Sequence, residues 1–350
     1  MSDLADPMEA AGSAAVVASA IELGLIESLS DPAPAAEHAS RLGLDPQATR
    51  LELEALVALG IAEERDGRFA GAEAADQLAP GPSLGALPEH GLWAHLPHFL
   101  RTGQRYARMD GSTAERSAAY KELTKALGRL FHDTARELAA KLTPRERILD
   151  VGAGSGVWSL AMAQRSAAAH ITAIDLPQVL PAFEERAERL GLRGQVELVA
   201  ADYHAMELPS KAFDRVLLAN VLHLEPPRSA RSLVRRVAAA LAPGGDLVVI
   251  DALAGGDPAR DRARSIYALH LAMRTRRGRV HPRAEVEHWC RDAGLGEGEL
   301  ITLSGPARAL GALIHRRPRR DDAGATDTRC ARRTRAAIGS RHGGPARWGP

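Results

Sequence analysis

The sequence contains little cysteine and no long apolar run. Cys290 and Cys330 are the only cysteines among 350 residues, which excludes a disulfide framework and a cysteine-rich metal cluster, so we expect no bound metal. No apolar stretch reaches the roughly 18 residues of a membrane-spanning helix. The first ten residues, MSDLADPMEA, are acidic and lack the basic segment of a secretory signal. We therefore expect a cytoplasmic protein without a membrane partner.

Lysine is also scarce, and the charges are unevenly distributed. Lysine occurs only at positions 121, 125, 141 and 211, so most of the 45 basic residues are arginine. Ten Arg and three Asp lie from Arg316 onward, and because the whole chain carries +1, this excess of seven leaves −6 for the remainder. A negatively charged body argues against a nucleic-acid partner. Residues 318–350 have few apolar side chains and no periodicity, and we expect a disordered, Arg-rich tail.

A glycine-rich turn between a predicted strand and a predicted helix is the central motif. Residues 148–161 read ILDVGAGSGVWSLA, in which Asp150 interrupts an apolar strand. Three glycines follow at alternate positions, Gly152, Gly154 and Gly156. The dinucleotide fingerprint requires a glycine where Val157 stands, and the P-loop requires a lysine that this sequence lacks. The pattern resembles motif I of S-adenosylmethionine (SAM) dependent methyltransferases, in which the loop packs on the amino-acid part of the cofactor and the acidic residue helps to hold its ammonium. A glycine turn without a ligand is the alternative.

From residue 147 the sequence alternates between strand-like and helix-like segments, which predicts an α/β domain over residues 143–317. The strands are expected at 148–151, 171–174, 196–200, 215–219, 246–250, 299–303 and 310–315. A Pro-Gly-Gly turn at 243–245 precedes the fifth strand, and a Gly-Pro turn joins the last two. An antiparallel final pair is typical of the Rossmann-like, seven-stranded SAM methyltransferase fold.

Polar residues follow two of these strands, where ligands of open α/β sheets bind. Asp175 stands nineteen residues after Gly156, and its carboxylate can accept hydrogen bonds from both hydroxyls of a ribose. A strand-ending aspartate without this role is the alternative. Asp202 can accept from an adenine amino group while the ring of Tyr203 packs on the base, or it can cap a turn.

Residues 1–85 have a winged-helix pattern. Helices are predicted at 11–29, 36–42 and 47–59, with Asp45 as N-cap and Pro46 at the first helical position. A β-wing with an Asp-Gly turn follows at 61–70. A DNA-reading helix would carry basic side chains, whereas the helix at 47–59 contains Glu52 and Glu54 against one cation, Arg50. This composition favours a dimerisation domain over a DNA-binding one.

Two longer segments identify a family resemblance. They read AIDLPQVLPAFEERAERLGLRGQVELVAADY and FDRVLLANVLHLEPP, and are similar to the winged-helix-dimerised O-methyltransferases of the plant caffeate and bacterial polyketide-tailoring type. The resemblance covers roughly residues 10–316 and is strongest from 147 to 251. It implies a homodimer formed through the N-terminal domain. It also implies that residues 86–142, including a long helix expected at 114–142, link the domains and cover the substrate.

The resemblance also implies roles for individual residues. The residues expected to hold SAM, together with Asp150 and Gly156 of the motif, are Gly152, Gly154, Asp175, Leu176, Asp202, Tyr203 and Asn220. His223 stands where the family keeps its catalytic histidine, and Asp251 matches one of two acidic residues that flank it. Trp93 and His132 are candidates for the substrate pocket. The sequence departs from the family at Ala219, where a lysine is usual, at Leu224-Glu225, where Asp-Trp is usual, and near Val280-His281, where the second acidic residue is missing.

These observations predict a SAM-dependent methyltransferase that acts on an oxygen, hydroxyl or carboxylate, of a small natural product. Two alternatives stay open. One is an N- or C-methyltransferase, or a non-methylating SAM enzyme, on the same scaffold. The other is a SAM-responsive winged-helix regulator that binds DNA.

Overall fold

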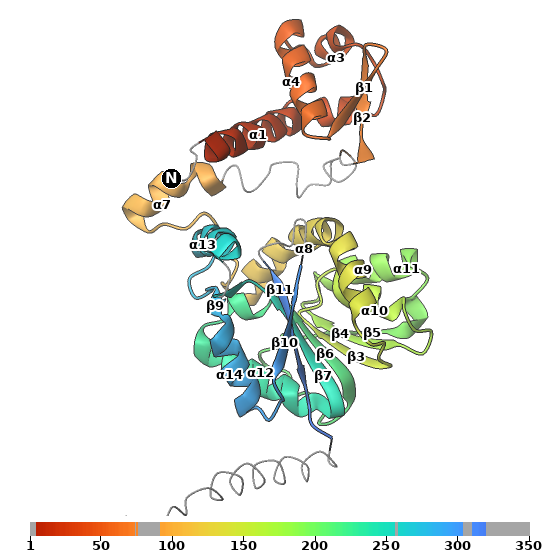
Figure 1. Cartoon of the computed structure of the whole chain (residues 1–350), viewed down its shortest axis with the longest axis vertical. Helices are drawn as coiled ribbons and strands as arrows, with labels where there is room; N and C mark the ends of the chain where they lie inside the picture. The colour runs from red at the N-terminus through yellow and green to blue at the C-terminus, as the bar shows by residue number, and fades with distance from the viewer. Residues whose placement is uncertain (1–4, 74, 76–91, 256–257, 304–309, 320–350) are drawn as a thin grey trace, which may run out of the picture.

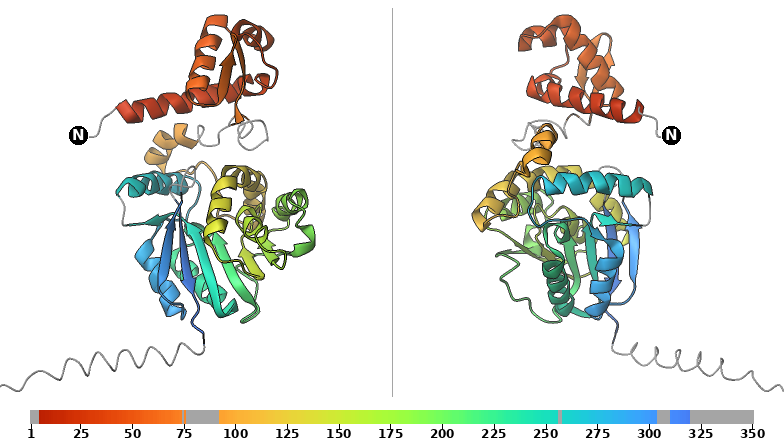
Figure 2. Two further views of the ribbon diagram at one scale, coloured as in Figure 1. Left: turned by 45° about the vertical axis from the view of Figure 1, so that its right-hand side comes forward. Right: turned by 90° about the vertical axis from the view of Figure 1, so that its left-hand side faces the viewer.

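The computed structural model describes residues 5–73, 75, 92–255, 258–303 and 310–319. An N-terminal unit of helices and a small hairpin precedes a larger α/β unit built on a central sheet (Figure 1). The three views show the N-terminal unit as a separate layer beyond one end of the sheet strands (Figures 1 and 2). No helix among the described residues is long and apolar enough to cross a membrane.

The N-terminal unit contains α1 (Ala5–Glu22), α2 (Leu25–Ser28), α3 (Ala35–Leu42), α4 (Pro46–Ala58), β1 (Ala62–Arg65) and β2 (Arg68–Gly71). The prediction of one helix at 11–29 was wrong, because Gly24 adopts a left-handed conformation (φ 73°) that ends α1 and starts α2. The predicted cap is confirmed, since the Asp45 carboxylate accepts from Ala48 N at 2.8 Å. Asp66 (φ 52°) and Gly67 (φ 73°) form the tight turn between β1 and β2.

In the described part of the region between the two units lie α7 (Leu96–Thr102), α8 (Thr113–Leu130) and α9 (His132–Lys141). A capping box formed by Ser112 and Glu115 starts α8. The predicted single helix at 114–142 was wrong, because the backbone leaves helical geometry at Phe131 (φ −98°, ψ 7°). The Phe131 side chain is buried and packs on Trp158, with ring centroids 5.7 Å apart, so tertiary packing accompanies the break.

The central sheet has seven strands in the order β10-β11-β7-β6-β3-β4-β5. Their bounds are β3 (Arg147–Val151), β4 (His170–Asp175), β5 (Val196–Ala200), β6 (Phe213–Ala219), β7 (Leu241–Asp251), β10 (Gly298–Thr302) and β11 (Gly311–Arg316). β3 to β7 are parallel, and β11 is antiparallel to both β7 and β10. The predicted seven-stranded, methyltransferase-type sheet is confirmed.

Neither of the two turns predicted for the sheet is found among the described residues. The predicted Pro-Gly-Gly turn at 243–245 lies inside β7, where the pairing with β6 shifts register between Phe213 and Arg215. This irregularity lets the strand begin at Leu241, before the turn, rather than after it. The predicted Gly-Pro turn between the last two strands lies outside the described residues, as does the expected tail from residue 320 onward.

Helices cover both faces of the sheet, and alternate strand residues point to each. The helices on the two faces are α9, α10 (Val157–Ala163), α11 (Leu180–Arg189), α12 (Pro227–Ala240) and α14 (Arg283–Asp292), whereas α13 (Pro258–Ala272) lies across the end of the sheet nearest the N-terminal unit (Figure 1). Short elements complete the unit: η1 (Arg193–Gln195), η2 (Leu222–Leu224), β8 (Leu253–Ala254) and β9 (His281–Pro282). Ile148 packs with α9, α10 and α11, whereas its neighbour Leu149 packs with α12 and α14. Both faces are therefore buried, as a parallel sheet requires.

Candidate active site

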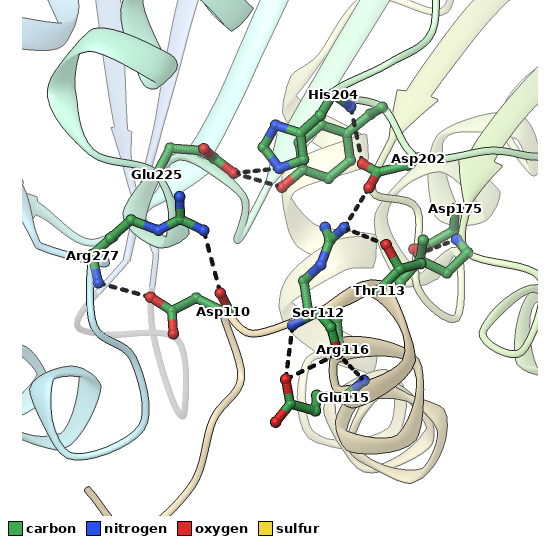
Figure 3. A network of polar contacts seen from close by, with 12 residues as sticks. Asp110, Ser112, Thr113, Glu115, Arg116, Asp175, Asp202, His204, Glu225 and Arg277 are labelled. Atoms are coloured by element: carbon green, nitrogen blue, oxygen red, sulfur yellow. Dashed lines mark hydrogen bonds and ion pairs between the residues drawn. The ribbon is translucent and has the colours of Figure 1, made fainter. Parts of the chain in front are cut away.

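A cavity of about 300 Å³ lies at the carboxyl ends of the parallel strands. Its position is where the strand order reverses, because β3 has β4 on one side and β6 on the other. The loops after these strands contribute the wall residues Gly152, Gly154, Asp175, Leu176, Tyr203, Asn220, Leu224 and Glu225. α8 and the segment before it contribute Met109, Arg116, Tyr120, Thr124 and Leu127. Figure 3 shows the polar contacts around the cavity.

The three glycines of the loop after β3 have different surroundings. All adopt left-handed conformations, with φ between 56° and 69°. Gly152 and Gly154 line the cavity, and a Cβ at Gly152 would lie 2.8 Å from Val221 Cγ2. Gly156 does not line it. A Cβ there would lie 2.4 Å from the ring of Phe183, so Gly156 allows close packing between the start of α10 and α11.

Asp175 ends β4 and fastens the glycine loop. Its Oδ2 accepts from Gly154 N and its Oδ1 from Leu176 N, both at 2.7 Å. Burial raises the pKa of Asp175, although these two backbone hydrogen bonds oppose the shift. Each carboxylate oxygen keeps a further lone pair, and Asp175 belongs to the cavity wall. The backbone therefore fixes the carboxylate in a position where it can accept from a ligand.

Asp150 lies deeper than the cavity wall. It is the fourth residue of β3 and is only 2% exposed. Burial raises its pKa to about 7. The structure therefore places Asp150 behind the glycine loop, whereas Leu176 lies on the cavity wall.

The segment after β5 forms a charged network with α8 and η2 (Figure 3). The Asp202 carboxylate accepts from the Arg116 guanidinium and, at 3.0 Å, from His204 N. Burial alone would raise the pKa of Asp202, but these hydrogen bonds outweigh it and lower the pKa. Glu225 accepts from Tyr203 Oη and pairs with His204 Nε2, each at 3.0 Å. Tyr203 and Arg116 line the cavity, and the Asp202 side chain faces Arg116 beside it.

Asn220 directly follows β6 and has a left-handed backbone (φ 57°), which is uncommon for a residue with a side chain. Its N–H donates to Ile250 O at 2.8 Å. Such strained positions concentrate at functional sites. Asn220 lies on the cavity wall at the turn that leads into η2.

His223, in η2, belongs to a buried hydrogen-bonded series. Its Nδ1 lies 2.7 Å from Asp251 Oδ1, and its backbone N donates to Asp251 Oδ2 at 3.1 Å. The carboxylate assigns the proton to Nδ1, so Nε2 accepts from the Tyr267 hydroxyl at 3.1 Å. His223 is 5% exposed and lies next to, rather than among, the residues of the cavity wall, while its neighbours Val221 and Leu224 are part of it.

The two predicted substrate residues lie outside the cavity wall. Trp93 stacks on His270, with ring centroids 5.8 Å apart. His132 begins α9, and its Nδ1 faces Arg186 Nη2 at 2.8 Å. Burial and the positive charge of Arg186 lower the pKa of His132. The His132 ring thus contacts α11 and not the cavity.

Several residues were missed when only the sequence was considered. One face of α8 supplies Arg116, Tyr120, Thr124 and Leu127 to the cavity, at the three- and four-residue spacing of a helix face. That spacing is visible in the sequence, but which face meets the cavity is not. His281 was considered only as a departure from the family pattern, at the place where the second acidic residue is missing. Its Nε2 contacts Leu222 O and Glu225 O at 3.0 and 3.1 Å and holds the η2 segment in place.

Comparison with known proteins shows relatives over most of the chain. A family model described as an O-methyltransferase domain matches residues 100–296, more than half of the chain. The chain is 31% identical to 3-hydroxy-5-methyl-1-naphthoate 3-O-methyltransferase of Streptomyces sahachiroi, over 82% of this chain and 87% of that protein. It is also 31% identical to the N,N-dimethyltransferase OxyT of Streptomyces rimosus, over 69% and 74%.

Solved structures share the fold. Human N-acetylserotonin methyltransferase in complex with SAM superposes with a TM-score of 0.69 at 19% identity, covering 90% of this chain and 96% of that chain. The matched fold, the cavity at the strand-order reversal and the matched family model agree. The chain therefore belongs to the O-methyltransferase family.

Proposed function

We propose that the chain is a cytoplasmic enzyme that transfers a methyl group from SAM to an oxygen of a small natural product. The observation that carries this proposal is the cavity in which the glycine loop and the Asp175 carboxylate meet, next to a buried histidine–aspartate pair. The family assignment and a SAM-bound structural relative support it.

The described residues fit SAM. Gly152 and Gly154 lie on the cavity wall, and without a Cβ their backbone can approach the amino-acid part of the cofactor closely. Asp175 offers its carboxylate to the ribose hydroxyls, and Leu176, Tyr203 and Asn220 line the remaining wall. Asp202 lies beside the cavity and accepts a hydrogen bond from Arg116, which orients the Arg116 side chain on the cavity wall. We assign Asp150 and Gly156 to the support of the loop, since neither lines the cavity.

We assign His223 as the base and Asp251 as the group that orients it. When bound, SAM supplies a methyl group on a positively charged sulfur. Removing the acceptor's proton makes its oxygen a better nucleophile, and a positioned imidazole contributes about 10²–10⁴-fold to such steps. Asp251 keeps the proton on Nδ1 and leaves the Nε2 lone pair to accept. The Tyr267 hydroxyl donates to that lone pair. The methyl acceptor therefore either displaces this hydroxyl from Nε2 or passes its proton to Nε2 by way of the hydroxyl.

The test combines product analysis with one substitution. Incubated with SAM and a panel of hydroxylated aromatic compounds, the protein should yield products one methyl group heavier, with the methyl on oxygen. Asp175→Ala removes the acceptor for two ribose hydroxyls, and hydrogen bonds to a charged group contribute about 1.5–3 kcal/mol each. Calorimetry should therefore show SAM affinity reduced at least about tenfold.

The matched control is Asp292→Ala, which removes an exposed carboxylate paired with Arg231 far from the cavity. It should leave SAM affinity unchanged. Equal SAM affinities for Asp175→Ala and the unaltered chain would refute the cofactor assignment, provided that both proteins show the same melting temperature.

A second candidate is transfer to nitrogen, because one relative of equal identity is named an N,N-dimethyltransferase. Adding aromatic amines to the panel separates the two activities by the position of the methyl group. The DNA-binding alternative receives no support from the relatives or from α4. In that helix Arg50 is paired with Glu54 at 2.8 Å, and Glu52 accepts from Ser19.

We also propose a homodimer that forms through the N-terminal unit. α1 is rich in Ala and Val, yet among its side chains from Ala10 to Glu22, the part whose burial is described, only Ala20 and Ile21 are buried within the chain. Leu23, Leu51 and Leu59 of the same unit are 40–62% exposed. This much uncovered apolar surface on a small unit favours a second subunit as its partner.

Light scattering at micromolar concentration should therefore give the mass of a dimer. The double substitution Ala14→Glu, Ala15→Glu places charge on the exposed part of α1 with only a small loss of helix propensity, and it should shift the protein toward monomer. Ala118→Glu, on the exposed side of α8, adds one negative charge elsewhere and should leave the dimer intact. A monomeric full-length chain would contradict this proposal.

A further inference from the structure

The segment before α8 is joined to the segment after α13 by hydrogen bonds. Residues 105–110 and 273–277 lie far apart in the sequence, but their backbones meet, for example where Met109 N donates to Arg274 O at 2.9 Å. Met109 and its neighbour Asp110 both lie on the cavity wall. The chain that leads from the N-terminal unit is therefore fixed to the α/β unit directly beside the cavity.

Asp110 is the carboxylate in this contact. Its Oδ2 accepts from Arg276 N at 2.6 Å and from Arg277 N at 2.7 Å, and its carbonyl oxygen accepts from the Arg277 guanidinium at 3.3 Å (Figure 3). Two consecutive N–H groups that share one oxygen fix the local direction of the backbone, because both have to stay within hydrogen-bond distance of it. Asp110 thus holds the start of the segment 276–281.

The same segment holds the backbone of His223. Arg279 N donates to His223 O at 2.8 Å. Gly278 packs so closely that a Cβ on it would lie 2.8 Å from His223 O. The contacts of His281 with the backbone of η2, two residues after Arg279, add to this support. A displacement of the segment 276–281 would therefore move His223.

We propose that Asp110 is a positioning residue for the methyl transfer and acts on His223 through the segment 276–281. The direction of Nε2 depends on the backbone of His223 as well as on the contact of its ring with Asp251. A misplacement of about 1 Å can reduce a rate about a hundredfold. Since both N–H groups meet one oxygen, the position requires an acceptor and not a negative charge. This inference rests on the proposed function and adds a residue that controls the proposed base.

The kinetic test compares Asp110→Ala with Asp110→Asn. Alanine removes the acceptor, so kcat for a hydroxyl acceptor should fall about tenfold or more while SAM affinity changes less than about twofold. Asparagine keeps one carbonyl oxygen for both N–H groups and should retain most of the rate. In a His223→Ala background, Asp110→Ala should lower kcat no further, because residues that act as one unit are not additive.

Hydrogen exchange followed by mass spectrometry gives a readout that needs no turnover. Asp110→Ala should speed the exchange of amides in 276–279 and in η2, whereas Asp110→Asn should not. Gly278→Ala disturbs the same segment independently, because the added Cβ would crowd His223 O. It should also lower kcat and speed the exchange in η2 without weakening SAM binding.

The matched control is Asp45→Ala. The Asp45 carboxylate also accepts from a backbone N–H, that of Ala48 at 2.8 Å, but it lies in the N-terminal unit. Its loss should lower the melting temperature, as the loss of a helix cap does. It should leave both kcat and the exchange in η2 unchanged, which separates a general loss of stability from the loss of position.

Three kinetic results would overturn the inference. They are an unchanged kcat of Asp110→Ala, a further loss when it is added to His223→Ala, and an Asp110→Asn variant as impaired as Asp110→Ala. The third result would indicate that the Asp110 charge contacts a ligand in the cavity directly. Failure of the proposed function is recognised separately, by an unaltered chain that methylates no compound of the panel. The exchange data then still decide this inference, and unchanged exchange in η2 of Asp110→Ala would refute it.

Discussion

Replacing His223 by alanine is expected to lower kcat for a hydroxyl acceptor by about a hundredfold or more while SAM affinity is retained. The imidazole is held by Asp251 on one side and presents Nε2 on the other, which is the arrangement of an oriented base. The side chain lies beside the cavity wall and not on it, so its loss should spare the cofactor site. Initial rates at saturating SAM, with calorimetry for binding, give both quantities.

His170→Ala is the control for this substitution. His170 is exposed at the start of β4, at the end of the sheet opposite the cavity, and its replacement should leave kcat unchanged. A loss below about threefold for His223→Ala would remove the histidine as the base, since positioned general bases contribute far more than that. Transfer would then depend on alignment alone, as it would for a carboxylate oxygen, which needs no deprotonation.

The largest loss of stability is expected for Asp246→Ala. The Asp246 carboxylate, near the start of the regular part of β7, accepts from Arg215 at 2.5 and 3.1 Å and from Arg145 at 2.8 and 2.9 Å. Arg215 is 2% exposed and would lose its counter-charge inside the fold. Breaking a buried ion pair in this way costs about 3–5 kcal/mol. Urea unfolding monitored by circular dichroism measures the change.

Asp214→Ala tests whether the effect depends on burial. Asp214 pairs with Arg147 at 2.7 Å at the same end of the sheet, but both side chains are partly exposed. Exposed pairs contribute about 0–1 kcal/mol, so this variant should unfold nearly as the unaltered chain does. Similar losses for the two variants would show that the Asp246 cluster does not behave as a buried pair.

The fold was largely predictable because its signals are local. Each strand of the sheet is a short apolar run between turn residues, and the Asp45–Pro46 helix start follows from capping chemistry alone. The two errors in the helices have different origins. The left-handed backbone of Gly24 divides α1 from α2 locally, whereas the break at Phe131 accompanies the packing of its ring on Trp158, more than 20 residues away.

The site was less predictable, for a related reason. The glycine pattern located the loop, but it could not show that Gly156 makes room for Phe183 and not for a ligand. The contact of Tyr267 with His223 joins residues 44 positions apart, and that of Arg116 with Asp202 joins residues 86 apart. The periodicity of apolar residues within one segment cannot predict contacts between residues so far apart in the sequence. Sequence patterns place residues on elements, whereas the packing of α8 and α13 decides which of them meet.

The direction of β11 has a practical consequence. Gly311 pairs with Asp251 beside the site, and Arg316 pairs with Asp246, so the strand runs away from the cavity for its six residues. At about 3.3 Å per residue this is a distance of roughly 20 Å. Arg317 then fastens the chain to the end of α12 by donating to Ala238 O and Leu241 O at 2.6 and 2.9 Å. A solid support or a fused reporter joined after Arg319 would thus be attached at the far end of the sheet, and an immobilised catalyst would keep its cavity facing the reaction medium.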